Sequence, residues 1–393
     1  MDRILTTHVG SLVRPGELLE FVAARETGRG YDVEAHRECL DRVVADVVDH
    51  QLAVGLDIVN DGEMGKEGWI TYLYGRLTGI ESRAVPADGE SVLPPSRDRL
   101  HFPGFYAEHD ATAVVEAATA QERRVWVCTG PIGYDPSAVR EDIDRLIEAL
   151  EGREHADAFL PVLAPASAYW LRDEHYGSEE EFVFALAEAM GEEYRTIVDA
   201  GLMVQVDDAV LMHERDSILA LGGTDADYRR WAQLRVEALN HALRGIPPER
   251  VRYHVCWGSN HGPHAYDPPL KDVIDLILQV DAGCYAIEQA NPRHEHEWAI
   301  WQDVTLPEGR KLIPGVVTHH AHVVEHPELV AQRLVRLADV VGRENVIGGT
   351  DCGFAQGAFI RRVHPEIQWA KLQSLAEGAR IASRRLWDSP ARA

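Results

Sequence analysis

The stretch that decides the fold is residues 312–348, which read LIPGVVTHHAHVVEHPELVAQRLVRLADVVGRENVIG. An apolar run at 312–317 leads into polar residues, and a second apolar run closes the stretch at 345–348. Between the two runs lies an amphipathic pattern that has Pro327 at a first-turn position and stops at Gly342. Proline fits the first turn of a helix and glycine commonly ends one, so the stretch predicts a strand, a helix and a second strand.

The same alternation of strand and helix patterns extends from Gly55 onward. Polar or Gly-rich residues follow each apolar run. Another helix is predicted between Ser178, which can form a capping box with Glu181, and Gly201. The eight runs lie at residues 57–60, 125–128, 159–163, 203–206, 252–255, 284–287, 312–317 and 345–348.

Eight strands with interposed helices predict an α/β fold of the (β/α)8 TIM-barrel type. A doubly wound sheet fits less well because no Gly-x-Gly-x-x-Gly fingerprint follows an early strand. We expect residues 1–393 to form one barrel domain with an N-terminal extension and a surface insertion near residues 82–120. The loosest part of that insertion is Ser82–Arg99, where polar residues, Pro and Gly crowd out a regular apolar pattern.

The charge balance and the cysteine content bound the possible functions. The 393 residues carry 39 Lys plus Arg against 64 Asp plus Glu, and the formal net charge of −25 argues against a nucleic acid partner. The start lacks the apolar segment of a signal peptide, and no segment reaches the ~18 apolar residues that cross a bilayer. We therefore expect a cytoplasmic protein without a membrane partner and leave a homo-oligomer open.

The 5 cysteines are too few for a disulfide scaffold, so a special cysteine here is a ligand or a nucleophile.

The residues directly after the apolar runs are the candidates for a site, because barrel enzymes place their chemistry at the carboxyl ends of the strands. In chain order they are Asp61, Glu63, Thr129–Pro131, Ser167, Asp207, Asp208, His254, Cys256, Glu288, His319, His320, Asp351 and Cys352.

Four of these residues predict a zinc site. His254 and Cys256 are two residues apart, so on a strand both side chains point to the same face. A thiolate beside an imidazole suits zinc, and Glu288 and Cys352 at later strand ends are able to supply the third and fourth ligands. The alternative is an ordinary buried pair, since cysteine is often found in protein cores. The dipeptide pattern alone favours that alternative, whereas the placement at strand ends favours the metal site.

The acidic residues Asp61, Glu63, Asp207 and Asp208 also admit two interpretations. Each one alone is as well explained as a solvated loop residue. Together, four acids at the mouth of a barrel are able to bind an ammonium group or to tune a proton transfer.

Eight short motifs occur in order along the chain: TTHVGS at 6–11, NDGE at 60–63, TGP at 129–131, VQVDD at 204–208, HVC at 254–256, AIE at 286–288, GVVTHH at 315–320 and DCG at 351–353. In order and spacing they resemble the catalytic barrel of cobalamin-independent methionine synthase and its shorter relatives, which include epoxyalkane:coenzyme M transferase. The resemblance covers nearly the whole chain.

The resemblance implies a zinc cofactor held by His254, Cys256, Glu288 and Cys352, with a thiol substrate that replaces or joins a ligand. It also matches His320 to a histidine that delivers a proton in methyl transfer.

The resemblance further implies a pocket for the amino-acid part of homocysteine. Ser11, Glu63 and Asp207 match positions that hold it, and we place Asp208 in the same pocket. Asp208 stands where the family usually has Glu, and Ala209 follows it in place of Pro. We count Asp207 with His320 among the catalytic residues, because an acid there is able to tune a proton transfer.

These expectations combine into one chemical hypothesis. A free thiol has a pKa near ~8.5, and coordination to zinc favours the thiolate, which then attacks an electrophilic carbon. Methyl transfer from a corrinoid, a small folate or another carrier would give a thioether, as in methionine biosynthesis. The folate-binding residues of the family are replaced here by Ile132–Pro136, which argues against a polyglutamylated folate as the donor.

Two alternatives remain open at this stage. An epoxide-opening thiol transferase acting on a sulfonated thiol would need cationic residues, for which Arg14, Arg293 and Arg361 are candidates. A non-catalytic zinc-containing binding protein is the other. A decarboxylase of the uroporphyrinogen type is disfavoured, because it would leave the predicted metal ligands without a role.

Overall fold

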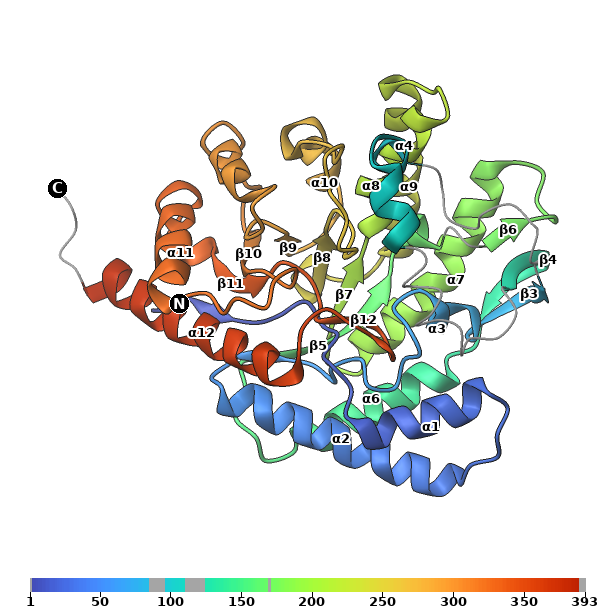
Figure 1. Ribbon diagram of the computed structural model, residues 1–393, viewed down its shortest axis with the longest axis horizontal. Coiled ribbons are helices and arrows are strands. Elements are labelled where there is room, and N and C mark those ends of the chain that lie inside the picture. The colour runs from blue at the N-terminus through green and yellow to red at the C-terminus, as the bar shows by residue number, and fades with distance from the viewer. Residues whose placement is uncertain (1, 85–95, 110–123, 169–170, 389–393) are drawn as a thin grey trace.

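The computed structural model describes residues 2–84, 96–109, 124–168 and 171–388. Its centre is a ring of parallel strands with helices around it (Figure 1). The neighbours in the 8-stranded sheet follow the order β1-β11-β10-β9-β8-β7-β5-β2. The strands are β1 (Leu5–Thr6), β2 (Ile58–Val59), β5 (Asp157–Leu163), β7 (Met203–Asp207), β8 (Val251–Val255), β9 (Cys284–Ile287), β10 (Lys311–Val317) and β11 (Ile347–Thr350).

Hydrogen bonds across β1 close the ring. The Thr7 amide donates to Gly348 O at 2.9 Å on one side of β1, and the Asp57 amide donates to Thr6 O at 3.0 Å on the other. The Thr7 hydroxyl also donates to Ile58 O at 3.0 Å. The predicted (β/α)8 barrel is therefore confirmed.

One of the predicted barrel strands is wrong. Residues 125–128 lie in β4 (Arg124–Tyr134), which pairs with β3 (Leu77–Ala84) and β6 (Leu171–Asp173) in a separate 3-stranded sheet. The missing barrel strand is β1, which lies in the segment expected to be an N-terminal extension. A strand of 2 residues is too short to give an apolar run, whereas β4 has the local pattern of a barrel strand.

Helices and short segments connect the strands. Residues 85–95 and 110–120 of the predicted insertion lie outside the described residues, and its described parts include the end of β3 and α4. The α-helices are α1 (Gly16–Glu26), α2 (Val33–Ala53), α3 (Thr71–Tyr74), α4 (Arg97–His101), α6 (Ser137–Leu150), α7 (Glu179–Asp199), α8 (Ala209–Ala220), α9 (Asp225–Ala242), α10 (Ile274–Ile277), α11 (Pro327–Val341) and α12 (Pro365–Ser383). The shorter elements are η1 (Pro165–Ser167), η2 (Pro248–Arg250), η3 (Leu270–Asp272), η4 (Glu295–Gln302), η5 (Arg343–Asn345), β12 (Ala355–Gly357), β13 (Ile360–Arg361) and η6 (Arg384–Asp388).

Two predicted helices begin and end as their sequences indicate. α7 follows Ser178, whose hydroxyl accepts the Glu181 amide, although the Glu181 carboxylate accepts from Gly177 and not from Ser178. α11 begins at Pro327 and ends before Gly342, which has a φ of 91°. Glycine adopts this left-handed conformation without steric cost, so the chain leaves the helix there.

The inside of the barrel is filled with side chains. Arg252 crosses it, donating to the Thr7 hydroxyl at 3.1 Å and to His8 O at 2.9 Å, and its guanidinium lies 3.6 Å from the centre of the Phe159 ring. A second apolar layer packs the strands against the surrounding helices.

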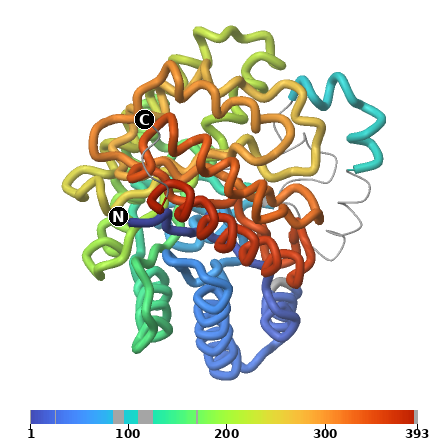
Figure 2. Tube along the Cα trace, turned by 90° about the vertical axis from the view of Figure 1, so that its left-hand side faces the viewer, coloured from blue at the N-terminus to red at the C-terminus, as the bar shows by residue number. Residues whose placement is uncertain are grey.

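In Figure 2 the N-terminal segment lies beside α12, where the Ile4 amide donates to Ser383 Oγ at 3.0 Å. Among the described helices, none has both the length and the apolar composition needed to traverse a bilayer.

The packing of α11 on the barrel gives a test of the fold. Leu334 is fully buried, whereas Leu329 on the same helix is 38% exposed. We expect Leu334→Ala to lower the free energy of unfolding by about 2–5 kcal/mol, because it removes buried methyl groups and leaves a cavity. Leu329→Ala is expected to change it by less than about 1 kcal/mol. Urea unfolding followed by circular dichroism measures both, and equal losses would contradict this packing.

Candidate metal centre

Three side chains from two strand ends converge at the mouth of the barrel. His254 lies in β8, Cys256 directly follows this strand, and Cys352 follows β11. Their ligand atoms all lie within 4.8 Å of one another, and the two sulfur atoms are 3.8 Å apart. This distance is too long for a disulfide, which needs about 2.05 Å. It equals the separation of about 3.8 Å expected for two sulfurs bound to one tetrahedral zinc ion through bonds of about 2.3 Å. The three donors therefore fit zinc.

The imidazole of His254 is oriented for metal binding. Its Nδ1 lies 3.2 Å from Ala286 O on the neighbouring strand β9, so Nδ1 carries the proton and donates it. Its Nε2 is buried and has no hydrogen-bond partner among the described residues. Burial opposes a charge on this ring, but the neighbouring Cys352 thiol outweighs burial and raises the pKa of His254. The nitrogen that remains free is therefore the one that faces the sulfur atoms.

The pKa values of the two cysteine thiols shift in opposite directions. Hydrogen bonding with Cys256 lowers the pKa of the Cys352 thiol well below its usual range, and the same contact raises the pKa of Cys256. The Ser259 hydroxyl also donates to Cys352 Sγ at 3.0 Å. One thiolate therefore forms readily even before a cation binds.

Glu288, His319 and His320 form a second group of possible ligands, whose ligand atoms also lie within 4.8 Å of one another. Glu288 follows β9 and is 1% exposed. Its Oε1 accepts from Asn291 Nδ2 at 2.6 Å and lies 3.3 Å from His320 Nε2. The structure thus sets Glu288 apart from the group of His254, Cys256 and Cys352. Its role as a ligand of that group stays a prediction.

The residues predicted to hold an amino acid lie near the cysteines. Asp207 ends β7, and burial raises the pKa of its carboxyl to about 7, with further effects from the charges of His254, Glu63, Lys66 and Cys352. A methyl group added at Gly353, next to Cys352, would clash with Ser11 Oγ, so the loop after Cys352 passes directly over Ser11.

Glu63 sits in a strained loop. Its φ of 57° is unusual for a residue with a side chain, and its buried carboxylate lies 3.5 Å from Lys66 Nζ. The preceding Asp61 Oδ1 accepts the Glu63 amide at 2.9 Å, and burial raises the pKa of Asp61 to about 6. The NDGE motif thus fixes the backbone at Glu63 through the Asp61 carboxylate.

Asp208 follows β7 as expected but already has protein partners, whereas the segment Thr129–Pro131 lies elsewhere than expected. Asp208 is 2% exposed, and its two oxygens accept from Ser167 Oγ at 3.0 Å and from the Tyr253 hydroxyl at 2.8 Å. A substrate contact of Asp208 stays a prediction, since protein groups already bind both oxygens. Thr129–Pro131 lies inside β4 and does not end a barrel strand, because its run belongs to the separate sheet.

The structure also gives the surroundings of the three arginines that were candidates for binding a sulfonated thiol. Arg293 and Arg361 are exposed. Arg14 is buried, and its Nη2 donates to Glu63 O at 2.7 Å and to Lys66 O at 2.6 Å. Arg14 therefore holds the loop that carries Glu63.

The sequence analysis missed one charged residue of the site, Lys66. This lysine is buried, contacts Glu63 and Pro161 O, and lies 4.2 Å from the centre of the Tyr72 ring. Its spacing of three residues from Glu63 is the signal that could have indicated it.

Reasoning from the sequence also missed a chain of polar groups behind His320. The His264 ring lies 5.4 Å from the His320 ring, His264 and His294 share Asp267 Oδ2 at 2.9 and 3.0 Å, and His294 also contacts Glu297. His264, Asp267 and His294 come from loops and Glu297 from the short helix η4, where the sequence carries no periodic signal.

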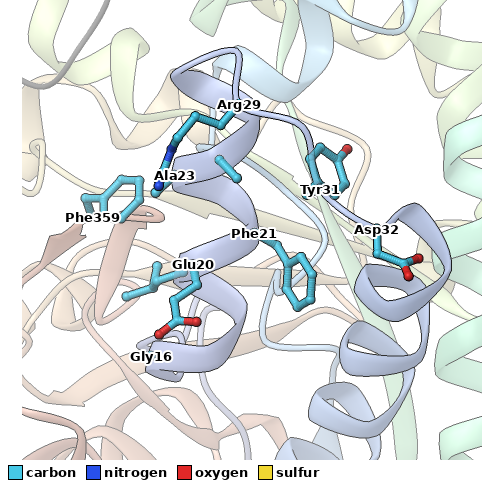
Figure 3. Close-up of a pocket in the computed structure, with 10 residues that line it drawn as sticks. Gly16, Glu20, Phe21, Ala23, Arg29, Tyr31, Asp32 and Phe359 are labelled. Atoms are coloured by element: carbon cyan, nitrogen blue, oxygen red, sulfur yellow. The ribbon is translucent and has the colours of Figure 1, made fainter.

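A hollow of about 610 Å³ on the surface lies apart from this centre. It is bounded by α1, the segment after it and Phe359 (Figure 3). None of the predicted site residues lines it.

Comparisons with known proteins agree with the fold and with the family resemblance. A family model described as the catalytic domain of cobalamin-independent synthase matches residues 167–367. The methionine synthase of Sulfurisphaera tokodaii is 24% identical over 383 residues, which cover 97% of this chain and 93% of that protein. The methionine synthase of Thermococcus kodakarensis is 25% identical over 388 residues, which cover 97% and 94%.

A solved structure has the same fold. The B12-independent methionine synthase of a Shewanella species, in complex with selenomethionine, superposes with a TM-score of 0.72 and 19% identity. The match covers 98% of this chain and 100% of that chain. The whole barrel, and not a part of it, is therefore shared.

The raised pKa of Asp207 predicts a pH-dependent stability of the metal-free protein. The pKa is about 7 in the folded state against 3.8 ordinarily, so folding favours the protonated carboxyl. Its contribution to stability is complete below about pH 4 and is lost as the pH rises to about 7. Across this pH range, we expect the free energy of unfolding of wild type to fall by on the order of 2–4 kcal/mol relative to that of Asp207→Asn. Urea unfolding of both chelator-treated proteins at several pH values measures the difference, and parallel stability curves would refute it.

Proposed function

The chain belongs to the cobalamin-independent synthase family, and from this premise we propose that it is a zinc-dependent methyltransferase. It makes a thioether from homocysteine or a related small thiol and a methyl donor such as a corrinoid or a small folate. The proposal treats residues 1–393 as a single catalytic domain, located in the cytoplasm.

The observation that carries the proposal is the spacing of the sulfur atoms of Cys256 and Cys352, with the free nitrogen of His254 beside them. These three residues would hold the zinc, and Glu288 is the proposed fourth ligand in the absence of substrate. Zinc lowers the pKa of a bound thiol and so supplies a thiolate at neutral pH.

The acidic side of the barrel mouth would bind the rest of the substrate. Glu63 and Asp207 are carboxylic acids near the cysteines, and an amino acid carries an ammonium group that pairs with carboxylates. Ser11 lies beside the loop that carries Cys352 and offers a hydroxyl. His320 is half-buried and lies on the same side of the centre as Glu288, where it is able to donate a proton to the atom that leaves the methyl group.

The epoxide-opening alternative has less support. A sulfonated thiol needs cationic donors, but Arg293 and Arg361 are exposed and Arg14 binds main-chain carbonyls. A purely structural zinc site has less support as well, since His254 and Cys256 come from a strand end of a barrel whose core is already filled.

Cysteine variants test the proposal. We expect Cys256→Ser and Cys352→Ser each to abolish methyl transfer to homocysteine and to lower the zinc content by about one equivalent, because each removes a thiolate ligand. Cys39→Ser, which changes a buried cysteine on α2, is the control and is expected to change neither. Metal analysis, far-UV circular dichroism and an assay for thioether product provide the readouts. Full activity in either ligand variant would overturn the proposal, and loss of the fold would favour a structural zinc site.

Glu63 tests the substrate class. We expect Glu63→Gln to raise the KM for homocysteine by roughly 10- to 100-fold with unchanged zinc content, because a charged hydrogen bond is worth about 1.5–3 kcal/mol. The exposed Glu67, which pairs with Arg25 at 3.0 Å, gives the control Glu67→Gln. An unchanged KM in Glu63→Gln would exclude the ammonium contact and reopen the choice of thiol.

A further inference from the structure

A buried ion pair lies beneath the loop that carries His320. This loop runs from Thr318, directly after β10, to His326, directly before α11. Lys371 on α12 is fully buried, and its Nζ lies 2.8 Å from Oε2 of Glu325, which is also buried. Replacing such a pair by apolar side chains often leaves a protein equally stable, so stability alone does not explain its presence.

The ion pair ties the two ends of the loop together. Glu325 Oε1 accepts the Thr318 amide at 2.9 Å, so one carboxylate joins the end of the loop to its start. Lys371 Nζ also donates to Val323 O at 2.6 Å, and the hydroxyl of Ser374 on α12 donates to Glu325 O. The segment between Thr318 and Val323 is therefore fixed at both ends.

His320 lies within this fixed segment. Its amide donates to Thr318 Oγ1 at 3.1 Å, so a path of two hydrogen bonds leads from Glu325 through Thr318 to the backbone of His320. The side chain of Val323, at the other end of the segment, is 75% exposed. Apolar packing therefore contributes little at that end, and the polar contacts of the ion pair hold it.

We propose that Glu325, paired with Lys371, is a positioning residue for His320 in the methyl transfer. The inference rests on the proposed function, in which His320 donates a proton to the atom that leaves the methyl group. A general acid acts only within hydrogen-bond reach of that atom, at about 2.6–3.2 Å. A displacement of about 1 Å at a reacting centre is able to cost about 100-fold in rate. Glu325 acts on the loop and not on the substrate.

Two variants break the bridge. Glu325→Gln keeps the size of the side chain, but its amide has one acceptor oxygen for the two donors, Thr318 and Lys371. Because this change leaves an ammonium group buried and unpaired, Glu325→Gln/Lys371→Met removes both charges and protects the fold. Two variants serve as controls. Glu328→Gln changes an acid on α11 whose side chain is 41% exposed, and Leu334→Ala lowers stability through the core.

Chemical modification reads the position of His320 without a substrate. Diethyl pyrocarbonate reacts with accessible imidazoles, and peptide mass spectrometry of the full chain measures the rate at each histidine. We expect His320 to react several-fold faster in both Glu325 variants than in wild type, because a released loop exposes its ring. The exposed His322 is the internal reference, and both controls should match wild type. An unchanged rate at His320, with circular dichroism showing folded variants, would overturn the proposal.

Kinetics measure the consequence for the reaction. With methyltetrahydrofolate, whose leaving nitrogen takes up a proton, we expect Glu325→Gln to lower kcat by roughly 10- to 100-fold without changing the KM for homocysteine. Zinc-dependent methylation of homocysteine by methyl iodide should keep its rate, because the leaving iodide takes up no proton. In a His320→Gln background, Glu325→Gln should cause no further loss.

Two kinetic results count against the proposal. One is a wild-type kcat in Glu325→Gln, and the other is a loss that adds to the loss in His320→Gln, as a general structural role would give. A wild type that methylates homocysteine with neither donor would contradict the proposed function instead. The modification rates at His320 would then still decide whether Glu325 holds this loop.

Discussion

Two sulfur atoms held 3.8 Å apart at the mouth of the barrel are the constraint on which the site depends. Cys256 and Cys352 are far apart in the chain and become neighbours only because β8, β9, β10 and β11 lie side by side in one parallel sheet. Parallel register carries the ends of these strands to the same edge. The short strand β1 closes the ring against β11 and thereby fixes the position of the Cys352 loop, whose Phe354 amide donates to Ser11 O at 2.8 Å.

The charges around this pair divide the barrel mouth into two sides. The sulfur atoms and His254 form one side, where soft ligands favour a zinc ion. Glu63, Asp207 and Lys66 form the other, and burial there holds the Asp207 carboxyl near its midpoint of titration at neutral pH. A substrate with a thiol at one end and an ammonium group at the other suits both sides at once. Glu288 lies 3.3 Å from His320 Nε2 and accepts a hydrogen bond from the amide of Trp257, the residue after Cys256.

The sequence predicted the barrel well because strand and helix periods are local properties. It failed at β1 and at residues 125–128, since membership of a barrel depends on pairing between distant strands and not on the pattern of one run. The close approach of His254 and Cys256 was predictable from the two-residue period of a strand. The separate grouping of Glu288 was not, because the direction of its carboxylate depends on contacts with Asn291 and His320. Nothing in the pattern GVVTHH indicates that His319 lacks a partner among the described residues.

The central claim is that the thiols of Cys256 and Cys352 bind a zinc ion that accepts a third sulfur from the substrate. X-ray absorption at the zinc edge of the full chain measures the ligands of this centre directly. The account predicts about two sulfur neighbours per zinc at about 2.3 Å, rising to about three when homocysteine is added. A sulfur count of zero, or one that no added thiol raises, would contradict it.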